Sequence, residues 1–218
     1  GDPVRAAGMA ELRRELCDEA LRLARILAGL APREAEVHGL VALLEIQASR
    51  LGARLAPDGA PVLLLDQDRR RWDHLLIGRG LAALGRAEAL GGLAGPYALQ
   101  AAIAACHTRA RKPGDTDWRR IAGLYGELAE ITPSPIVELN RAVAISMAEG
   151  PAAGLVLVDA LAEEPALKAY HLLPSVRGDL LHKLGRMDEA RAEFSRAAAM
   201  TRNAREKALL QARAVACA

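Results

Sequence analysis

Residues 171–200 read HLLPSVRGDLLHKLGRMDEARAEFSRAAAM, and this stretch decides the fold class. Apolar and small residues recur at helical spacing on both sides of Gly185, which predicts two helices joined by a turn. The spacing of Ile121 and Tyr125 recurs at Ala190 and Phe194, about two periods of a roughly 34-residue helical repeat later. Stacked helical repeats usually offer surfaces to partners, so we first expect a binding protein.

The composition also indicates helices. The 218 residues are 51% hydrophobic but only 3% aromatic, and a core of Ala, Leu and Val lets helix axes approach closely. The chain is therefore predicted to be all-α. Before the repeats, apolar periodicity predicts helices at 11–29, 33–51 and 67–90.

Three helix pairs are predicted at 97–131, 135–163 and 171–201, with a closing helix from about Asn203. The last pair most resembles a tetratricopeptide unit, with small residues where its helices must approach. In the middle pair, Gly154 stands at the alanine position of the second helix and is expected to loosen that helix by up to about 1 kcal/mol. We expect helical hairpins stacked as a short tetratricopeptide-like right-handed solenoid in residues 96–218, after a compact helical platform in residues 1–95.

Charge and cysteine content narrow the function classes. Lys and Arg total 29 against 27 Asp and Glu, a net charge of +2 without a basic arm, which disfavours direct DNA binding despite the cluster Arg69–Arg71. Three scattered cysteines fit a reducing compartment, and we expect a cytoplasmic location.

The uncharged stretch 89–108 is broken by glycines and Pro96, so no membrane segment is predicted. Gly1 in place of Met suggests that the chain is a piece of a longer protein.

Two Asp-x-Asp triplets, at 66–68 and 115–117, are the strongest candidates for chemistry. Paired carboxylates can hold a divalent cation or share acid and base work. Each triplet also precedes a predicted helix, where Asp commonly caps free N–H groups, and we favour that interpretation. The five histidines lack metal-ligand spacing, and no nucleophile elbow, Walker loop or Rossmann fingerprint occurs. We expect no enzyme, no cofactor and no metal site.

Arg141 and Arg177 stand about one period apart at a helix position that is usually apolar. Their stems can cover apolar surface while the guanidinium groups reach acids such as Glu138 and Asp179. Alternatively, they receive an acidic partner segment. We expect Arg141 and Arg177 on the concave face of the helical stack. That face is expected to include further partner-binding candidates, Asn140, Asp179 and His182.

Several runs together resemble one known region. They are DQDR at 66–69, WD at 72–73, GPYALQAAIAACH at 95–107, DTDW at 115–118, PSP at 133–135, LNRAVA at 139–144 and YHLLP at 170–174. The runs are similar to the C-terminal extension of bacterial extracytoplasmic-function (ECF) RNA polymerase sigma factors, a helical domain that ends in tetratricopeptide-like repeats.

The resemblance implies a regulatory, protein-interaction role in transcription initiation. The implied partners are the sigma region 2 and region 4 domains of the same protein, the RNA polymerase core, or a signalling protein. We expect docking on the concave face together with a corner formed by Asp66, Asp68, Arg69, Trp72 and Asp73. Nothing in the chain resembles the promoter-reading helices. The alternatives are a free-standing tetratricopeptide scaffold and, third, an all-α enzyme that uses an Asp pair.

Overall fold

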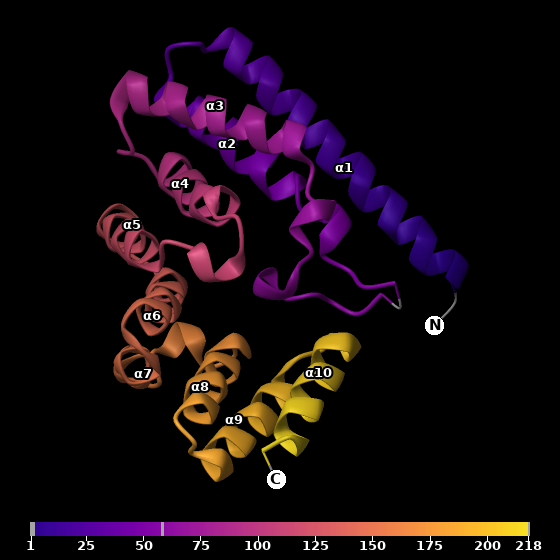
Figure 1. Cartoon of the computed structure of the whole chain (residues 1–218), viewed down its shortest axis with the longest axis vertical. Coiled ribbons are helices and arrows are strands. Elements are labelled where there is room, and N and C mark those ends of the chain that lie inside the picture. Colours follow the sequence, from indigo (N-terminus) through magenta and orange to yellow (C-terminus); the bar gives the residue numbers. More distant parts are fainter. Residues whose placement is uncertain (1–2, 58, 218) are drawn as a thin grey trace. The chain divides into compact units, whose positions relative to one another are not determined.

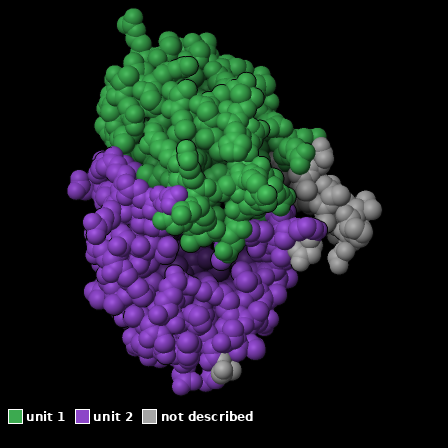
Figure 2. Space-filling view, in the orientation of Figure 1, with its two compact units in different colours: residues 1–54, 64–114 green, residues 55–63, 115–218 purple. Residues whose placement is uncertain are grey.

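The computed structural model describes residues 3–57 and 59–217 (Figure 1). These residues form ten α-helices and five short 3-10 helices, and they contain no β-strand, which confirms the predicted all-α class. The chain divides into two compact units (Figure 2). The first unit covers 1–54 and 64–114, and the second covers 55–63 and 115–218.

The first unit is built around α2 (Ala35–Ala48), which packs against α1 (Pro3–Leu30), α3 (His74–Gly91) and α4 (Pro96–Arg109) (Figure 1). Small residues at the contact points let α2 pack closely against its neighbours. A Cβ atom added to Gly39 would lie 2.6 Å from the backbone nitrogen of Ala98 in α4, and one added to Gly80 would lie 2.7 Å from Ile46. The backbones can approach this closely only without side chains at those points.

A carboxylate of α2 closes the start of α4. The two oxygens of Glu36 accept hydrogen bonds from the backbone nitrogens of Tyr97 and Ala98, each at 2.9 Å. These are donors that a helix leaves free at its N-terminus, and a negative charge is stabilising there. Gly95 is the N-cap residue of α4, and a Cβ at that position would overlap Glu36.

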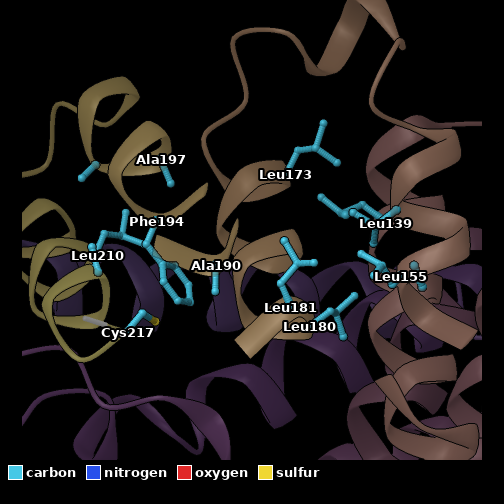
Figure 3. Packing of buried hydrophobic residues seen from close by; sticks show 14 of the residues in the cluster. Leu139, Leu155, Leu173, Leu180, Leu181, Ala190, Phe194, Ala197, Leu210 and Cys217 are labelled. Atoms are coloured by element: carbon cyan, nitrogen blue, oxygen red, sulfur yellow. The ribbon is translucent and has the colours of Figure 1, made fainter. Parts of the chain in front are cut away.

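The second unit stacks six helices in chain order. They are α5 (Trp118–Ile131), α6 (Pro135–Glu149), α7 (Pro151–Ala160), α8 (Leu172–Lys183), α9 (Met187–Met200) and α10 (Ala204–Val215). Each helix packs against the next, a solenoid-like arrangement in which neighbours in sequence are neighbours in space. A continuous core joins α6 to α10 through residues such as Leu139, Leu181 and Phe194 (Figure 3). The predicted closing helix is α10.

Two glycines set the closest approaches in this stack. A Cβ on Gly178 of α8 would lie 2.9 Å from the ring of Phe194, which agrees with the predicted contact between the helices of the last pair. A Cβ on Gly154 of α7 would lie 2.4 Å from Cβ of Ser146 in α6. The expectation that Gly154 merely loosens its helix is therefore incomplete, because its small size is what lets α6 and α7 pack.

The first predicted helix pair differs in the structure. The expected pair 97–131 corresponds to α4 and α5, but α4 packs against α2 and α3 in the first unit, whereas α5 packs against α6 in the second. Accordingly the units divide after Gly114 and not between residues 95 and 96. Nine helical positions of α4 are buried, more than one repeat partner could cover, and this explains its place inside the first unit.

Short 3-10 helices connect the longer elements: η1 (Leu51–Ala53), η2 (Leu64–Asp66), η3 (Arg69–Arg71), η4 (Pro113–Asp115) and η5 (Pro165–Leu167). Within the described residues, no helix has the length and apolar character needed to cross a membrane.

Candidate functional site

The predicted Asp66–Asp73 corner lies in the first unit, where η2, η3 and the start of α3 follow one another. Three of its four charged side chains are exposed, namely Asp66, Asp68 and Asp73. Asp68 accepts a hydrogen bond from the backbone nitrogen of Arg70 at 3.1 Å and pairs with that guanidinium at 3.0 Å. Asp73 caps α3 by accepting from the nitrogens of Leu75 and Leu76 at 2.9 and 3.0 Å. Asp68 thus caps η3, as the sequence favoured for the triplet at 66–68, and Asp73 caps α3 in addition.

Arg69 and Trp72 of the same corner point inward. Trp72 is only 4% exposed and packs with Ala53 and Ile77. The guanidinium of Arg69 lies 4.7 Å from the centre of the Trp72 ring, and it donates to the backbone oxygen of Ala110 at 2.6 Å. Arg69 therefore ties η3 to the end of α4, while Trp72 packs against η1 and α3. The exposed residues of the corner, Asp66, Asp68 and Asp73, are the ones available to a partner.

A buried cationic group lies beside this corner. Arg50 is 9% exposed and donates to Gln47 at 2.5 Å, while His107 is 8% exposed. Burial, followed by the positive charges of Arg54 and Arg69, lowers the pKa of Arg50 to about 10. Burial, followed by the positive charges of Arg50 and Arg69, lowers the pKa of His107 to about 4. His107 is thus held neutral at pH 7, which its sequence context did not reveal.

The second predicted surface lies on α6 and α8 of the second unit. Arg141 pairs with Glu138 at 2.9 Å, as one of the two interpretations expected. Arg177 pairs with Asp159 of α7 at 2.7 Å and with Glu193 of α9 at 3.0 Å. Burial lowers the pKa of Arg177, but the two carboxylates outweigh that effect and the pKa is raised. Arg177 therefore joins three helices, with partners other than the Asp179 expected from the sequence.

Asp179 is held by two cations. Lys183 lies 2.7 Å away one turn later on α8, and Arg213 of α10 also donates to the carboxylate. Burial raises the pKa of Asp179, but the hydrogen bonds from these cations outweigh it and the pKa is lowered. The same Arg213 stacks over the ring of Phe194 at 4.4 Å. Asp179 thus anchors the last helix of the stack.

Asn140 and His182 remain open to a partner. Both are exposed, and in the part of the chain that the structure describes neither side chain makes a hydrogen bond or an ion pair. Together with Arg141, which is about one-third exposed, they are the predicted residues of this unit that a second protein can reach directly. The other two, Arg177 and Asp179, support the surface from within.

The second aspartate triplet also caps a helix. Asp117 accepts a hydrogen bond from the backbone nitrogen of Arg120 at 2.9 Å and so closes the start of α5, as predicted. Among the described residues, no group of three or more His, Cys, Asp and Glu side chains has the geometry to hold a metal ion.

Sequence reasoning missed one surface feature, a groove in the first unit. Residues of α1, α2 and α3 enclose a cavity of about 660 Å³, lined by Arg25, His38, Val41, Arg86 and their neighbours. An adjoining cavity of about 320 Å³ adds Glu45 and Arg79. Apolar periodicity predicts each helix separately, whereas a groove depends on how the three helices are placed together.

Comparison with known proteins gives two matches. The chain is 49% identical over 197 residues to an uncharacterized protein of Rhizobium meliloti (strain 1021), and the matched region covers 90% of this chain and 46% of that protein. The chain therefore spans about half the length of this relative. No solved structure gives a significant match. Residues 5–88, which include α2 and most of α1 and α3, match the model of a family of unknown function, DUF6596.

Proposed function

We propose that the chain is the C-terminal regulatory and protein-interaction region of an ECF sigma factor. In this role it modulates transcription initiation in the cytoplasm through contacts with the sigma domains of the same protein, with RNA polymerase, or with a signalling partner. The observation that carries the proposal is the solenoid-like stack from α5 to α10, with Asn140 and His182 exposed on it. Stacks of this kind are extended and rigid, and they suit binding more than catalysis.

The ion pairs of the second unit support this assignment. Arg177 bridges α7, α8 and α9, and Asp179 is tied to Arg213 of α10. These links hold α7, α8, α9 and α10 together, and α8 carries the exposed His182. A surface whose supports are fixed before binding loses less conformational entropy when a partner docks.

The sigma-factor part of the proposal has separate support. The runs around Trp72, Trp118 and His171 resemble the extension of ECF sigma factors, and the Rhizobium meliloti relative has room for further domains because the chain spans 46% of it. An interaction region acting on domains of the same polypeptide benefits from a high effective concentration, so weak contacts suffice.

A chimera tests the surface. In it, this chain replaces the matched region of the Rhizobium meliloti relative. The residues of this chain can then be substituted within the longer protein and assayed with RNA polymerase. We expect Asn140→Ala with His182→Ala to change transcript yield by core RNA polymerase severalfold, with an unchanged melting temperature. His74→Ala, an exposed histidine at the start of α3, is the matched control. An unchanged yield in the double variant would remove these two residues from the proposed surface.

A further inference from the structure

The groove of the first unit has α2 as its floor and α1 and α3 as its walls. Its two adjoining cavities share Arg25, Val41, Ala83 and Arg86, so they form one continuous depression. Small and apolar residues make most of the lining: Ala28, Gly29, Pro32, Val41, Ala82, Ala83, Ala89 and Leu90. Leu90 is 43% exposed at one end. An open apolar trough between two helices can receive an amphipathic helix.

The rim of the groove is positively charged. The charged groups that line it are Arg25, Arg79, Arg86 and Glu45. Arg25 is neutralised by Glu45, since its Nε lies 2.8 Å from the carboxylate. Arg79 and Arg86 are exposed, and neither has an ion-pair partner among the described residues. The unbalanced charge of the groove is therefore the pair Arg79 and Arg86.

The floor carries an unsatisfied acceptor. Glu45 is 1% exposed, and while Oε1 accepts from Arg25, the buried Oε2 has no hydrogen-bond partner. A buried acceptor without a donor lowers stability by about 1–3 kcal/mol. Arg25 holds this buried carboxylate in the floor of the groove, so Arg79 and Arg86 are the charges that an occupant can meet.

We propose that this groove binds an acidic amphipathic helix of a partner polypeptide. The apolar face of that helix covers the exposed apolar residues of the lining, Ala82, Ala89 and Leu90, and its carboxylates pair with Arg79 and Arg86. These arginines are seven residues apart on α3, which is about 10 Å along the helix axis, so the matching acids belong at positions i and i+7 of the occupant. The proposal rests on the protein-interaction role proposed above and assigns it a second surface.

Charge-swapped peptides test the groove on the full 218-residue chain. The first probe is a synthetic helical peptide of about 18 residues with Leu at i, i+3, i+4 and i+7 on one face and Glu flanking them two turns apart. The second probe carries Lys in place of each Glu. We expect fluorescence anisotropy to give a Kd on the order of 10–100 µM for the Glu peptide and at least about tenfold weaker binding of the Lys peptide.

The decisive variant is Arg79→Glu with Arg86→Glu. It should reverse the preference, so that the Lys peptide binds more tightly than the Glu peptide. Arg119→Glu with Arg202→Glu changes the net charge equally at exposed arginines outside the groove, and it should leave the original preference intact. Circular dichroism on each variant shows whether the helices are retained, and Arg79→Gln with Arg86→Gln supplies a neutral version in which both peptides should bind alike.

Three results would overturn the proposal: no binding of the Glu peptide, equal binding of both peptides, or a preference that the groove variant does not change. None of these would bear on transcription. Conversely, a chimera that failed to act with RNA polymerase would contradict the sigma-factor role. The peptide result would still show whether the groove binds an acidic helix. The two experiments therefore separate failure of the groove from failure of the proposed function.

Discussion

Arg177 and Arg141 look alike in the sequence, but only Arg177 joins separate helices. The side chain of Arg177 is 24% exposed and lies between Asp159 and Glu193, whereas Arg141 pairs with Glu138 of its own helix. An ion pair between half-buried groups on different helices restrains the packing, while one within an exposed helix face contributes little. An arginine side chain is long enough to pair with an acid on its own helix or on a neighbouring helix. Residue type alone therefore could not distinguish Arg141 from Arg177.

Replacing Arg177 by Met should therefore lower stability. The change leaves Glu193, which is 13% exposed, with only the longer contact of 3.6 Å to Arg196. We expect a loss of about 1–3 kcal/mol in the free energy of unfolding, measured by urea titration. Arg191→Met removes an exposed pair with Asp188 and should cost less than about 0.5 kcal/mol. Equal effects of the two substitutions would show that the links of Arg177 contribute nothing.

His107 should make stability depend on pH. Its pKa is lowered to about 4 in the folded chain, against an ordinary value of 6.5. Between these values the unfolded chain binds a proton that the folded chain does not. The contribution of neutral His107 to the free energy of unfolding is therefore fully present above about pH 6.5. It is lost as the pH falls toward 4, with a slope of at most about 1.4 kcal/mol per pH unit. Urea midpoints between pH 4.5 and 7 should fall more steeply for the natural chain than for His107→Gln, and parallel curves would contradict this.

At the scale of elements, small residues decide which helices pair. Helix α7 can lie against α6 because Gly154 has no side chain, and α8 can lie against α9 because Gly178 has none. Helix propensity argues the other way, since glycine destabilises a helix interior by about 1 kcal/mol relative to alanine. The close approach outweighs propensity at these two positions.

The substitution Gly154→Ala tests this balance. Its new Cβ would stand 2.4 Å from Ser146 Cβ, so α6 and α7 must separate, and we expect a net loss of about 1–3 kcal/mol. Gly123→Ala in α5 is the matched control, because no atom lies within 4 Å of the added Cβ. That control should stabilise the chain by up to about 1 kcal/mol. Thermal unfolding of both variants measures the contrast, and stabilisation by both would refute the packing argument.

Apolar periodicity predicted most helices to within a few residues. The predicted helix from Trp118 corresponds to α5, and the predicted closing helix from Asn203 corresponds to α10. Each of these helices has its own capping residue and its own apolar face, so the local sequence is sufficient to define it. The position of α4 was not predictable in this way, since its contacts with α2 and its cap from Glu36 come from residues about 60 positions away.

The candidate surfaces were predictable only in part. The sequence located charged and aromatic residues at the corner and on α6 and α8, but it could not show that Trp72 is buried or that Arg69 turns onto it. Those facts depend on contacts with Ile77 and with the end of α4. The groove and the buried Glu45 likewise require the placement of three helices.

At the scale of the whole molecule, each unit has its own surface. The first offers an arginine-rimmed groove, and the second offers Asn140 and His182 on stacked helices. The chain also spans 46% of its Rhizobium meliloti relative. In the proposed function, both surfaces are available to contact partner domains.

The central claim is tested most directly by transcription. The measurement compares RNA 5′ ends made from a genomic DNA library by core RNA polymerase with the chimera, and with the chimera from which this chain has been deleted. The account predicts that the chimera binds core polymerase and initiates at a defined set of promoters, and that deletion changes the yield at those promoters severalfold. A chimera that neither binds core polymerase nor initiates at any promoter would contradict the account.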